Sequence, residues 1–382
     1  MNHFKKKYLL DVTEEKISDL KNRLKMTCFP DESVPGKWNA GTELGWFKEL
    51  IRYWIEEFDW KKQEKLLNSF DQYQYFSQKC NVHYIYSKGL GNKNIPLLLL
   101  HGWPGSIFEF MELIPMLNNP KKYGINSENS FDVIVPCLPG YGLSLNKNRR
   151  FGTEEISTIL HTFMLEELKI NQFGIQGGDW GAIIGSKMSQ MYPQNIKGLH
   201  LNFLAIDRNL SEKEYHLPEE IKYFDQVKYW KHEEMGYYFI QGTKPQTLAY
   251  ALSDSPAGLA AWIAEKFYTW TDNDGSPESV ISLDRILANI SFYWFTNSVG
   301  SSFWPYYARH HREWPVTSAN PVLIPTGYAE FPKEILRPPM SIAKETYTNI
   351  KRWEIMSEGG HFAALEKPNL LAKEICEFFQ IL

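Results

Sequence analysis

The stretch Gly177-Gly178-Asp179-Trp180-Gly181 carries the strongest structural signal in this chain. The residues from Phe173 to Gln176 before it predict a short strand, and those from Ala182 onward predict a buried helix. Glycines two residues before and two after the centre are typical of a sharp strand-to-helix turn that exposes a nucleophile. Asp179 stands where such turns usually carry serine. An aspartate forms its ester by displacement at a saturated carbon, which indicates alkyl halides or epoxides and excludes peptides and carboxylic esters.

Two apolar runs upstream of this turn predict neighbouring strands. The first, Ile95 to Leu100, leads into the loop His101-Gly102-Trp103-Pro104-Gly105-Ser106 and then a helix from about Ile107 to Leu117. The second, Phe131 to Pro136, ends in a turn rich in glycine and proline. Strand, helix, strand, helix and turn in this order predict an α/β fold with a mostly parallel sheet flanked by helices.

Two backbone donors are expected beside the nucleophile. In an α/β-hydrolase fold, one N–H of the oxyanion hole comes from the loop after an early strand and the other from the residue after the nucleophile. In this chain the two residues are Trp103 and Trp180.

A base is expected near the C-terminus, because this fold orders its catalytic residues as nucleophile, acid and histidine. His361 follows the strand-like segment Arg352 to Met356 and the pair Gly359-Gly360, which places it on a loop at the end of a strand. The other nine of the ten histidines lack such a setting. His101 is the main rival, although the geometry of its loop explains its presence better.

Three carboxylates compete for the role of the acid. Glu330 and Glu334 follow a strand predicted from Pro321 to Thr326, whereas Asp207 follows the apolar run Leu199 to Ile206. Any of the three would stabilise a charged imidazole by hydrogen bonding to it. Their spacing along the chain does not choose among them.

The chain is predicted to divide into a helical lead-in at residues 1–90, a first part of the core at 91–207, a helical lid at 208–314 and a second part of the core at 315–382. Helices are expected at Pro256 to Thr269, at Ser282 to Thr296 and from about Pro368. The segment Asp272 to Pro277 is predicted to be a turn. Aromatic residues make up 15% of the chain, and many lie between Tyr223 and Trp314, which predicts an apolar lid over a pocket for a hydrophobic substrate.

Charge and cysteine content exclude several classes of protein. With 41 Lys and Arg against 45 Asp and Glu, the net charge of −4 indicates no surface for nucleic acid or anionic membranes. No signal peptide and no apolar stretch of about 20 residues is visible. The four cysteines are scattered, which argues against a disulfide framework or a metal site and predicts a reducing compartment, most simply the cytoplasm.

Several motifs together resemble the microsomal type of epoxide hydrolase, a family with the α/β-hydrolase fold, and the resemblance extends over nearly the whole chain. The motifs are His101 to Ser106, Gly177 to Gly181, Asp254 to Trp262, Pro325 to Glu334 and Gly359 to Ala364. The fold that it implies includes a helical lid insertion and an N-terminal lead-in. Animal microsomal enzymes also carry a hydrophobic anchor before this region, which is not expected here.

The resemblance implies a role for each candidate residue. Asp179 is the nucleophile, His361 the general base and Glu334 its charge partner. Two lid tyrosines are expected to donate protons to the epoxide oxygen. The first is Tyr237, and the second is Tyr306 in preference to the adjacent Tyr307.

The implied reaction adds water to a lipophilic epoxide and gives a vicinal diol through a hydroxyalkyl-aspartyl ester, in keeping with a role in detoxification. No cofactor, metal, nucleic acid or membrane anchor is expected, and a homodimer is compatible with the resemblance. A haloalkane dehalogenase with the same Asp179 nucleophile is the alternative, but it requires a halide-binding Asn or second Trp and no paired tyrosines. A non-catalytic binding protein is disfavoured, because nucleophile, base and acid are all present.

Overall fold

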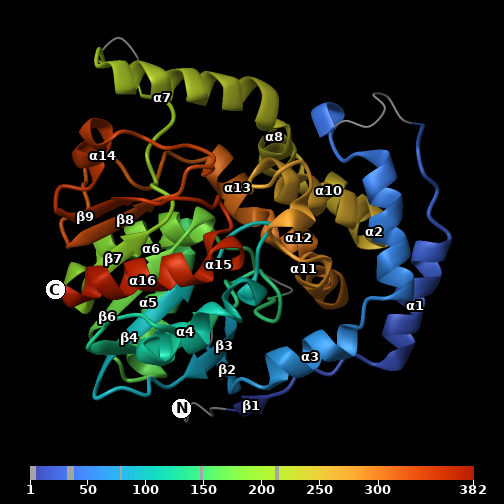
Figure 1. Cartoon of the computed structure of the whole chain (residues 1–382), viewed down its shortest axis with the longest axis horizontal. Coiled ribbons are helices and arrows are strands. Elements are labelled where there is room, and N and C mark those ends of the chain that lie inside the picture. Colours follow the sequence, from blue (N-terminus) through green and yellow to red (C-terminus); the bar gives the residue numbers. More distant parts are fainter. Residues whose placement is uncertain (1–5, 32–37, 78–79, 147–148, 211–214) are drawn as a thin grey trace.

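The structure, a computed structural model, describes residues 6–31, 38–77, 80–146, 149–210 and 215–382 (Figure 1). Within these residues nine strands form one mixed sheet in the spatial order β1-β2-β3-β5-β4-β6-β7-β8-β9. The strands are β1 (Lys6–Tyr8), β2 (Gln72–Phe76), β3 (Asn81–Ser87), β4 (Lys93–Leu100), β5 (Asn129–Pro136), β6 (Phe173–Gly177), β7 (Ile196–Leu201), β8 (Thr326–Glu330) and β9 (Ile350–Ile355).

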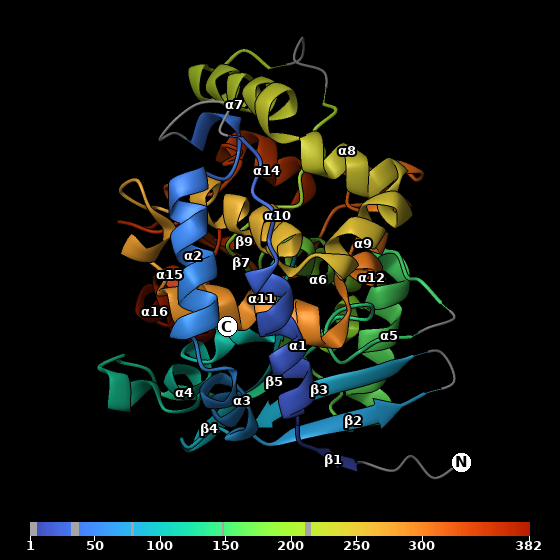
Figure 2. The same cartoon turned by 90° about the vertical axis from the view of Figure 1, so that its right-hand side faces the viewer.

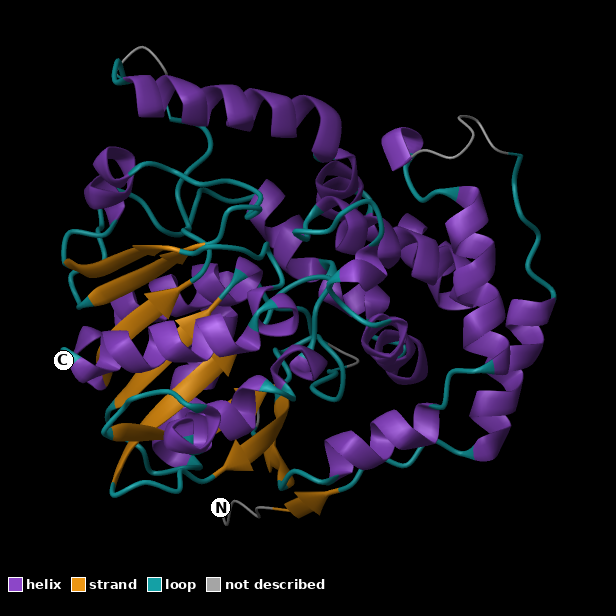
Figure 3. Ribbon diagram, in the orientation of Figure 1, coloured by secondary structure: helices purple, strands orange, loops and turns teal. Residues whose placement is uncertain are grey.

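The six strands from β4 to β9 pair in parallel, whereas β1, β2 and β3 add an antiparallel edge. Residues 97–100 of the central strand β4 are fully buried, as expected for a strand covered by helices on both faces. Figure 3 shows these two layers of helices around the sheet. The helices α4 (Leu113–Asn118) and α16 (Pro368–Gln380) pack together on one face, and α5 (Thr153–Glu166) and α6 (Asp179–Met191) on the other. The predicted α/β-hydrolase fold is confirmed.

The N-terminal segment contains strands as well as helices. Its helices are α1 (Glu14–Lys25), η1 (Trp38–Ala40), α2 (Leu44–Glu56) and α3 (Trp60–Asn68), but β1, β2 and β3 also lie before residue 91 and belong to the sheet. The alternation of Gln and Tyr at residues 72–75 is a strand signal that the helical interpretation of residues 1–90 omitted. The sheet of the core therefore begins within the predicted lead-in.

Two predicted elements differ from those in the structure. The helix expected from Ile107 to Leu117 is divided into the 3₁₀ helix η2 (Ile107–Phe110) and α4. The strand expected from Pro321 to Thr326 begins only at Thr326, because Pro321 and Pro325 lack the N–H groups that a strand donates. Short helices also occur outside the cap, namely η3 (Pro120–Tyr123), η4 (Pro193–Asn195), α14 (Met340–Thr346) and α15 (Ala363–Glu366).

A helical cap lies between β7 and β8 in the sequence and beside the sheet in space (Figure 1). The helix α10 occupies the predicted residues 256–269 and begins at Pro256 after Ser255, whose side chain accepts a hydrogen bond from the Gly258 N–H. None of the described helices combines the length and hydrophobicity that a membrane crossing requires. The cap consists of α7 (Pro218–Tyr229), η6 (Trp230–Glu234), α8 (Gly236–Thr243), α9 (Pro245–Asp254), α10 (Pro256–Thr269), η7 (Pro277–Ser279), α11 (Leu283–Thr296), α12 (Val299–Ser302) and α13 (Trp304–His310).

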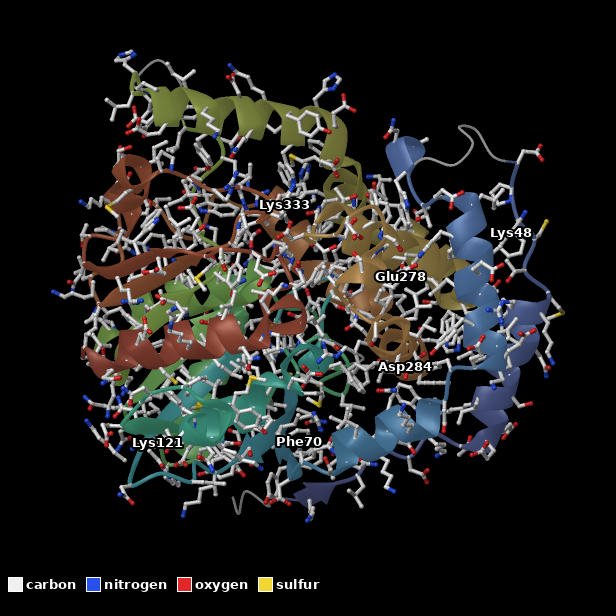
Figure 4. All side chains as sticks on the ribbon, in the orientation of Figure 1. Lys48, Phe70, Lys121, Glu278, Asp284 and Lys333 are labelled. Carbon is white, nitrogen blue, oxygen red and sulfur yellow. The ribbon has the colours of Figure 1, made fainter. Side chains whose placement is uncertain are left out.

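The N-terminal helices brace this cap. Figure 2 shows α1 and α2 alongside the cap helices α10 and α11. The indole N–H of Trp46 donates to Glu278 at 2.7 Å, and the Tyr53 hydroxyl donates to Asp284 at 3.0 Å. Figure 4 labels both carboxylates on the cap. Side-chain hydrogen bonds therefore join α2 to the cap.

Candidate active site

The turn between β6 and α6 holds Asp179 in a strained backbone conformation. Its φ angle is +47°, in the left-handed region that Asp tolerates better than most residues. A Cβ atom on Gly181 would lie 2.1 Å from the Leu100 carbonyl oxygen, and one on Gly177 would lie 2.6 Å from the Gly181 backbone. Only glycine fits at these two positions. The predicted strand-to-helix turn is present, with the helix beginning at Asp179 rather than at Ala182.

The loop after β4 reaches one oxygen of the Asp179 carboxylate. The backbone N–H of Trp103 donates to Oδ1 at 2.8 Å. This approach requires Gly102, because a Cβ atom there would lie 2.2 Å from the same oxygen. Trp180 follows Asp179 in the first turn of α6, where helical N–H groups have no partner within the helix and favour negative charge.

The other oxygen of Asp179 faces the histidine. Nε2 of His361 lies 3.6 Å from Oδ2 of Asp179, and its Nδ1 lies 2.6 Å from Oε1 of Glu334. The side chains of His361 and Glu334 are 2% and 0% exposed, so both belong to the protein interior. Three residues that are far apart in sequence, Asp179, His361 and Glu334, thus form one connected array.

Two carboxylates hold a proton on His361. Burial alone lowers the pKa of this imidazole, but the charge of Glu334 and the hydrogen bonds and charge of Asp179 outweigh it and raise the pKa to about 10. In the resting site His361 is therefore an imidazolium at neutral pH.

The structure places the rival residues in other roles. Glu330 accepts a hydrogen bond from the Trp353 indole at 3.0 Å, and Asp207 accepts one from the backbone N–H of Asn209 at 3.0 Å. His101 accepts the Leu138 N–H at 3.2 Å, and burial lowers its pKa to about 4, so it is neutral. Of the three candidate acids, Glu334 is the one that pairs with His361.

The cap holds the loop of His361 in place. The carbonyl oxygen of Trp270 accepts the His361 N–H, and Asp272 accepts the Gly359 N–H, both at 2.9 Å. Glu366 accepts the N–H groups of Asp272 and Phe362 at 2.8 and 3.1 Å. The sequence predicts only a turn at Asp272 and gives no signal for Glu366, since carboxylates that bind a distant backbone leave no pattern in the sequence.

Two cap tyrosines lie in the aromatic wall around Asp179. The ring of Tyr237, on α8, stacks on Trp103 with a centroid distance of 5.3 Å. The ring of Tyr306, on α13, meets Trp180 edge-on at 4.7 Å and Tyr237 at 5.8 Å. The Tyr306 hydroxyl is buried and has no hydrogen-bond partner among the residues that the structure describes. Burial raises the pKa of both phenols, and the charge of Asp179 raises it further.

Tyr307 lies outside this wall. Its ring stacks on Trp304 at 4.7 Å and packs against His311 at 4.1 Å. Neighbouring residues on a helix point about 100° apart, so only one of the two adjacent tyrosines can face Asp179. The structure brings Tyr306, and not Tyr307, to the candidate site.

A small cavity lies beside Asp179. It has a volume of about 20 Å³ and is bordered by Trp103, Glu109, Asp179, Asn202 and His361, among others. This volume is sufficient for about one water molecule with several polar neighbours. In the described part of the chain, no three His, Cys, Asp or Glu side chains are grouped as they would be to bind a metal ion.

The raised pKa of His361 predicts a pH-dependent stability. Between about pH 6.5 and 10 the folded protein keeps the His361 proton, whereas the unfolded chain loses it, so the free energy of unfolding should fall as the pH rises. One such group contributes a slope of up to about 1.4 kcal/mol per pH unit. Urea unfolding over this range checks the expectation, with His361→Gln as the reference. Equal slopes in the two proteins would contradict it.

Comparison with known proteins identifies the family. A model described as the N terminus of epoxide hydrolases matches residues 5–110, and one for the alpha/beta hydrolase fold matches residues 95–214. Epoxide hydrolase 1 of Oryctolagus cuniculus is 37% identical over 97% of this chain and 88% of its own length. Juvenile hormone epoxide hydrolase 2 of Ctenocephalides felis is 34% identical over 96% of this chain and 84% of its own length.

Solved structures agree with this assignment. The crystal structure of juvenile hormone epoxide hydrolase from the silkworm Bombyx mori is 30% identical and superposes with a TM-score of 0.90, covering 99% of this chain and 94% of that one. The structure of Aspergillus niger epoxide hydrolase is 27% identical with a TM-score of 0.85, covering 98% and 96%. Because such relatives match nearly the whole chain in both sequence and fold, the chain belongs to the epoxide hydrolase family of the α/β-hydrolase fold and is an epoxide hydrolase.

Proposed function

We propose that this enzyme opens lipophilic epoxides through a covalent ester on Asp179 and releases vicinal diols. The observation that carries the proposal is that the two oxygens of the Asp179 carboxylate have different neighbours. Oδ1 is held by the Trp103 N–H, and Oδ2 faces His361, which is itself paired with Glu334. These contacts support a scheme in which Oδ2 attacks the epoxide and Oδ1 later carries the oxyanion.

In the first step, Oδ2 of Asp179 attacks an epoxide carbon, and the carbon–oxygen bond of the ring breaks. The released oxygen takes a proton from Tyr306 or Tyr237. The unpartnered hydroxyl of Tyr306 supports this role, since a buried donor without a partner is available to the substrate. The charge of Asp179 raises the pKa of both phenols. As Asp179 becomes a neutral ester this effect is lost, so the phenols become better proton donors.

Formation of the ester then converts His361 into a base. The ester is neutral, so the hydrogen bond and charge of Asp179 no longer raise the pKa of His361. The imidazolium transfers its proton to the tyrosinate, which restores the tyrosine hydroxyl and leaves a neutral imidazole. Glu334 stays beside it and stabilises the imidazolium that forms in the next step.

In the second step, His361 takes a proton from water, and the hydroxide attacks the ester carbonyl carbon of Asp179. The negative charge develops on Oδ1, where the N–H groups of Trp103 and Trp180 stabilise it, each by about 3 kcal/mol. The tetrahedral intermediate expels the diol oxygen, which takes the hydroxyl proton of the intermediate. Asp179 and the His361 imidazolium are restored, and one water has been added to one epoxide.

Heavy-oxygen water tests this scheme. With enzyme in excess over styrene oxide in H₂¹⁸O, the first turnover should place ¹⁸O in the Asp179 carboxylate and not in the diol. Peptide mass spectrometry locates the label in the protein. Label that enters the diol directly in the first turnover would show that water attacks the epoxide without an ester.

We expect Tyr306→Phe to slow ester formation about 10- to 100-fold, because a general acid contributes about 10²- to 10⁴-fold and Tyr237 remains as a second donor. Rapid-quench measurement of ester formation in a single turnover checks this. Tyr307→Phe is the matched control on the same helix and should leave the rate unchanged. A similar loss in both variants would contradict the assignment to Tyr306.

A second candidate reaction is dehalogenation. The indole N–H groups of Trp103 and Trp180 are buried and have no hydrogen-bond partner among the described residues, and such donors suit a halide leaving group. Bromoalkanes should therefore be assayed for bromide release beside the assay for diol. A faster release of bromide than of diol from comparable substrates would reverse the order of the two candidates.

We also infer a hydrophobic substrate and a reducing compartment. The site is walled by the contacting rings of Trp103, Tyr237, Trp270, Phe303 and Tyr306, which offer mainly apolar surface. All four cysteines are free, which is compatible with the cytoplasm.

A further inference from the structure

A second carboxylate borders the water-sized cavity beside Asp179. Glu109 lies in the short helix η2 and lines this cavity together with Asp179 and His361. A Cβ atom on Gly105 would lie only 1.4 Å from Oε1 of Glu109, so the carboxylate folds directly over this glycine. The loop that positions Trp103 thus also supplies the space in which the Glu109 carboxylate lies.

The loop beneath Glu109 is held rigidly by the cap helix α11. The Tyr293 hydroxyl donates to the Gly105 carbonyl oxygen at 2.8 Å, and the Asn289 amide donates to the Pro104 carbonyl oxygen at 2.7 Å. Ser106 closes this network by donating to Asn289 at 2.7 Å. Because its platform is fixed at three consecutive residues, Glu109 holds its position before substrate arrives.

The ionisation of Glu109 depends on its two titratable neighbours in the cavity. Burial raises the pKa of Glu109 to about 8, with His361 opposing the shift and Asp179 adding to it. In the described part of the chain, no Lys or Arg forms an ion pair with Glu109. A half-buried carboxylate without such a partner contributes little to stability. The free energy spent on removing it from water is more easily explained by a function.

We propose that Glu109 is a positioning residue that holds the hydrolytic water in this cavity, between its own carboxylate, His361 and the ester carbonyl carbon of Asp179. The proposal rests on the two-step mechanism above. The water donates one hydrogen bond to Nε2 of His361 and the other to Glu109. Its oxygen lone pair is thereby directed at the carbonyl carbon. The two-step mechanism keeps the same proton transfers and the same bonds, because Glu109 only accepts a hydrogen bond.

Glu109 acts in the second step and not in the first. While Asp179 is charged, its repulsion favours the protonated form of Glu109. Formation of the ester removes the charge of Asp179, and the proton transfer described above removes that of His361, so the two neighbours that act on the pKa of Glu109 in opposite directions are neutralised together. A carboxyl oxygen of Glu109 can accept a hydrogen bond from the water whether or not the group carries a proton. In the proposed first step the epoxide meets Oδ2 of Asp179 and the tyrosines, so the loss of Glu109 should spare the attack on the epoxide.

The test measures the two steps separately in the full-length enzyme with styrene oxide. We expect Glu109→Ala to leave the rate of ester formation within about 3-fold of wild type and to slow ester hydrolysis about 10- to 100-fold, so that the ester accumulates and is visible by intact mass. Glu109→Gln keeps an acceptor for the water and should lose less than Glu109→Ala. An unchanged first step also shows that the variant is folded.

Glu112→Gln is the matched control. Glu112 lies three residues further along the same segment, is exposed and pairs with Arg285, so the same change of charge should alter neither step. Equal slowing of both steps in Glu109→Ala and Glu109→Gln, or no slowing of hydrolysis in either, would overturn the role of Glu109 alone. A wild-type protein that never carries an ester would overturn the two-step mechanism and the role of Glu109 with it.

Discussion

Asp179→Asn should lower kcat by at least about 10⁴-fold, because a neutral amide is a very weak nucleophile. The replacement is suited to the site. Asn tolerates the φ angle of +47° as well as Asp does, and its side-chain oxygen can still accept the Trp103 N–H. The loss is therefore expected in chemistry and not in folding.

Diol formation and intact mass together check this result. The Asp179→Asn protein should carry no ester after incubation with epoxide, and its mass should confirm that the asparagine has not been hydrolysed back to aspartate. Asp207→Asn is the matched control and should keep nearly full activity, since the Asp207 side chain accepts a hydrogen bond from the backbone N–H of Asn209 and an asparagine oxygen can do the same. More than about 1% residual turnover in an intact Asp179→Asn protein would exclude the covalent scheme.

His361→Gln should separate the two chemical steps. Oδ2 of Asp179 and the tyrosines remain, so the variant should still be alkylated, but without a base the ester is hydrolysed very slowly. We expect kcat to fall about 10³-fold, within the usual range for a lost general base. The mass of the protein should increase by the mass of one epoxide per chain and stay increased. A variant that is folded but unmodified would contradict this order of steps.

Loss of stability must be distinguished from loss of the base. In His361→Gln the Glu334 carboxylate, which is fully buried, loses its cationic partner, and breaking a buried pair in this way typically costs about 3 to 5 kcal/mol. The double variant His361→Gln/Glu334→Gln removes that buried charge as well. It should be more stable than the single variant and just as slow in hydrolysing the ester. Recovery of turnover in the double variant would show that the defect of the single variant was one of folding.

Most of the fold could be predicted from local sequence, because several helices and strands show clear patterns over a few consecutive residues. The central strand β4 is a continuous apolar run, and α10 begins with a serine cap followed by proline. The strands β2 and β3 lie in a segment dominated by helical patterns, and they are held in the sheet by pairing of β2 with β3 and of β3 with β5. Pairing of this kind joins distant segments and is not visible in a local window.

The turn after β8 explains why Glu334, and not Glu330, lies beside His361. Glu330 and Glu334 are four residues apart, and either could follow a strand of uncertain length. In the structure the Lys333 N–H donates to the Gly359 carbonyl oxygen at 3.1 Å, which joins this turn to the histidine loop and places Glu334 against His361. The side chain of Glu330 is instead directed to Trp353 of the neighbouring strand.

Short local patterns predict the fold class, the turn that carries Asp179, the loop that carries His361 and the three candidate acids, because a strained turn and a glycine-flanked loop are properties of consecutive residues. The contacts of distant segments show that Glu334 pairs with His361, that Tyr306 lies in the aromatic wall, that Glu109 borders the same cavity, and that two carboxylates raise the pKa of His361. These properties depend on the distances and burial of charges brought together from β6, β8, β9 and the cap. Such distances exist only once the sheet and cap have assembled.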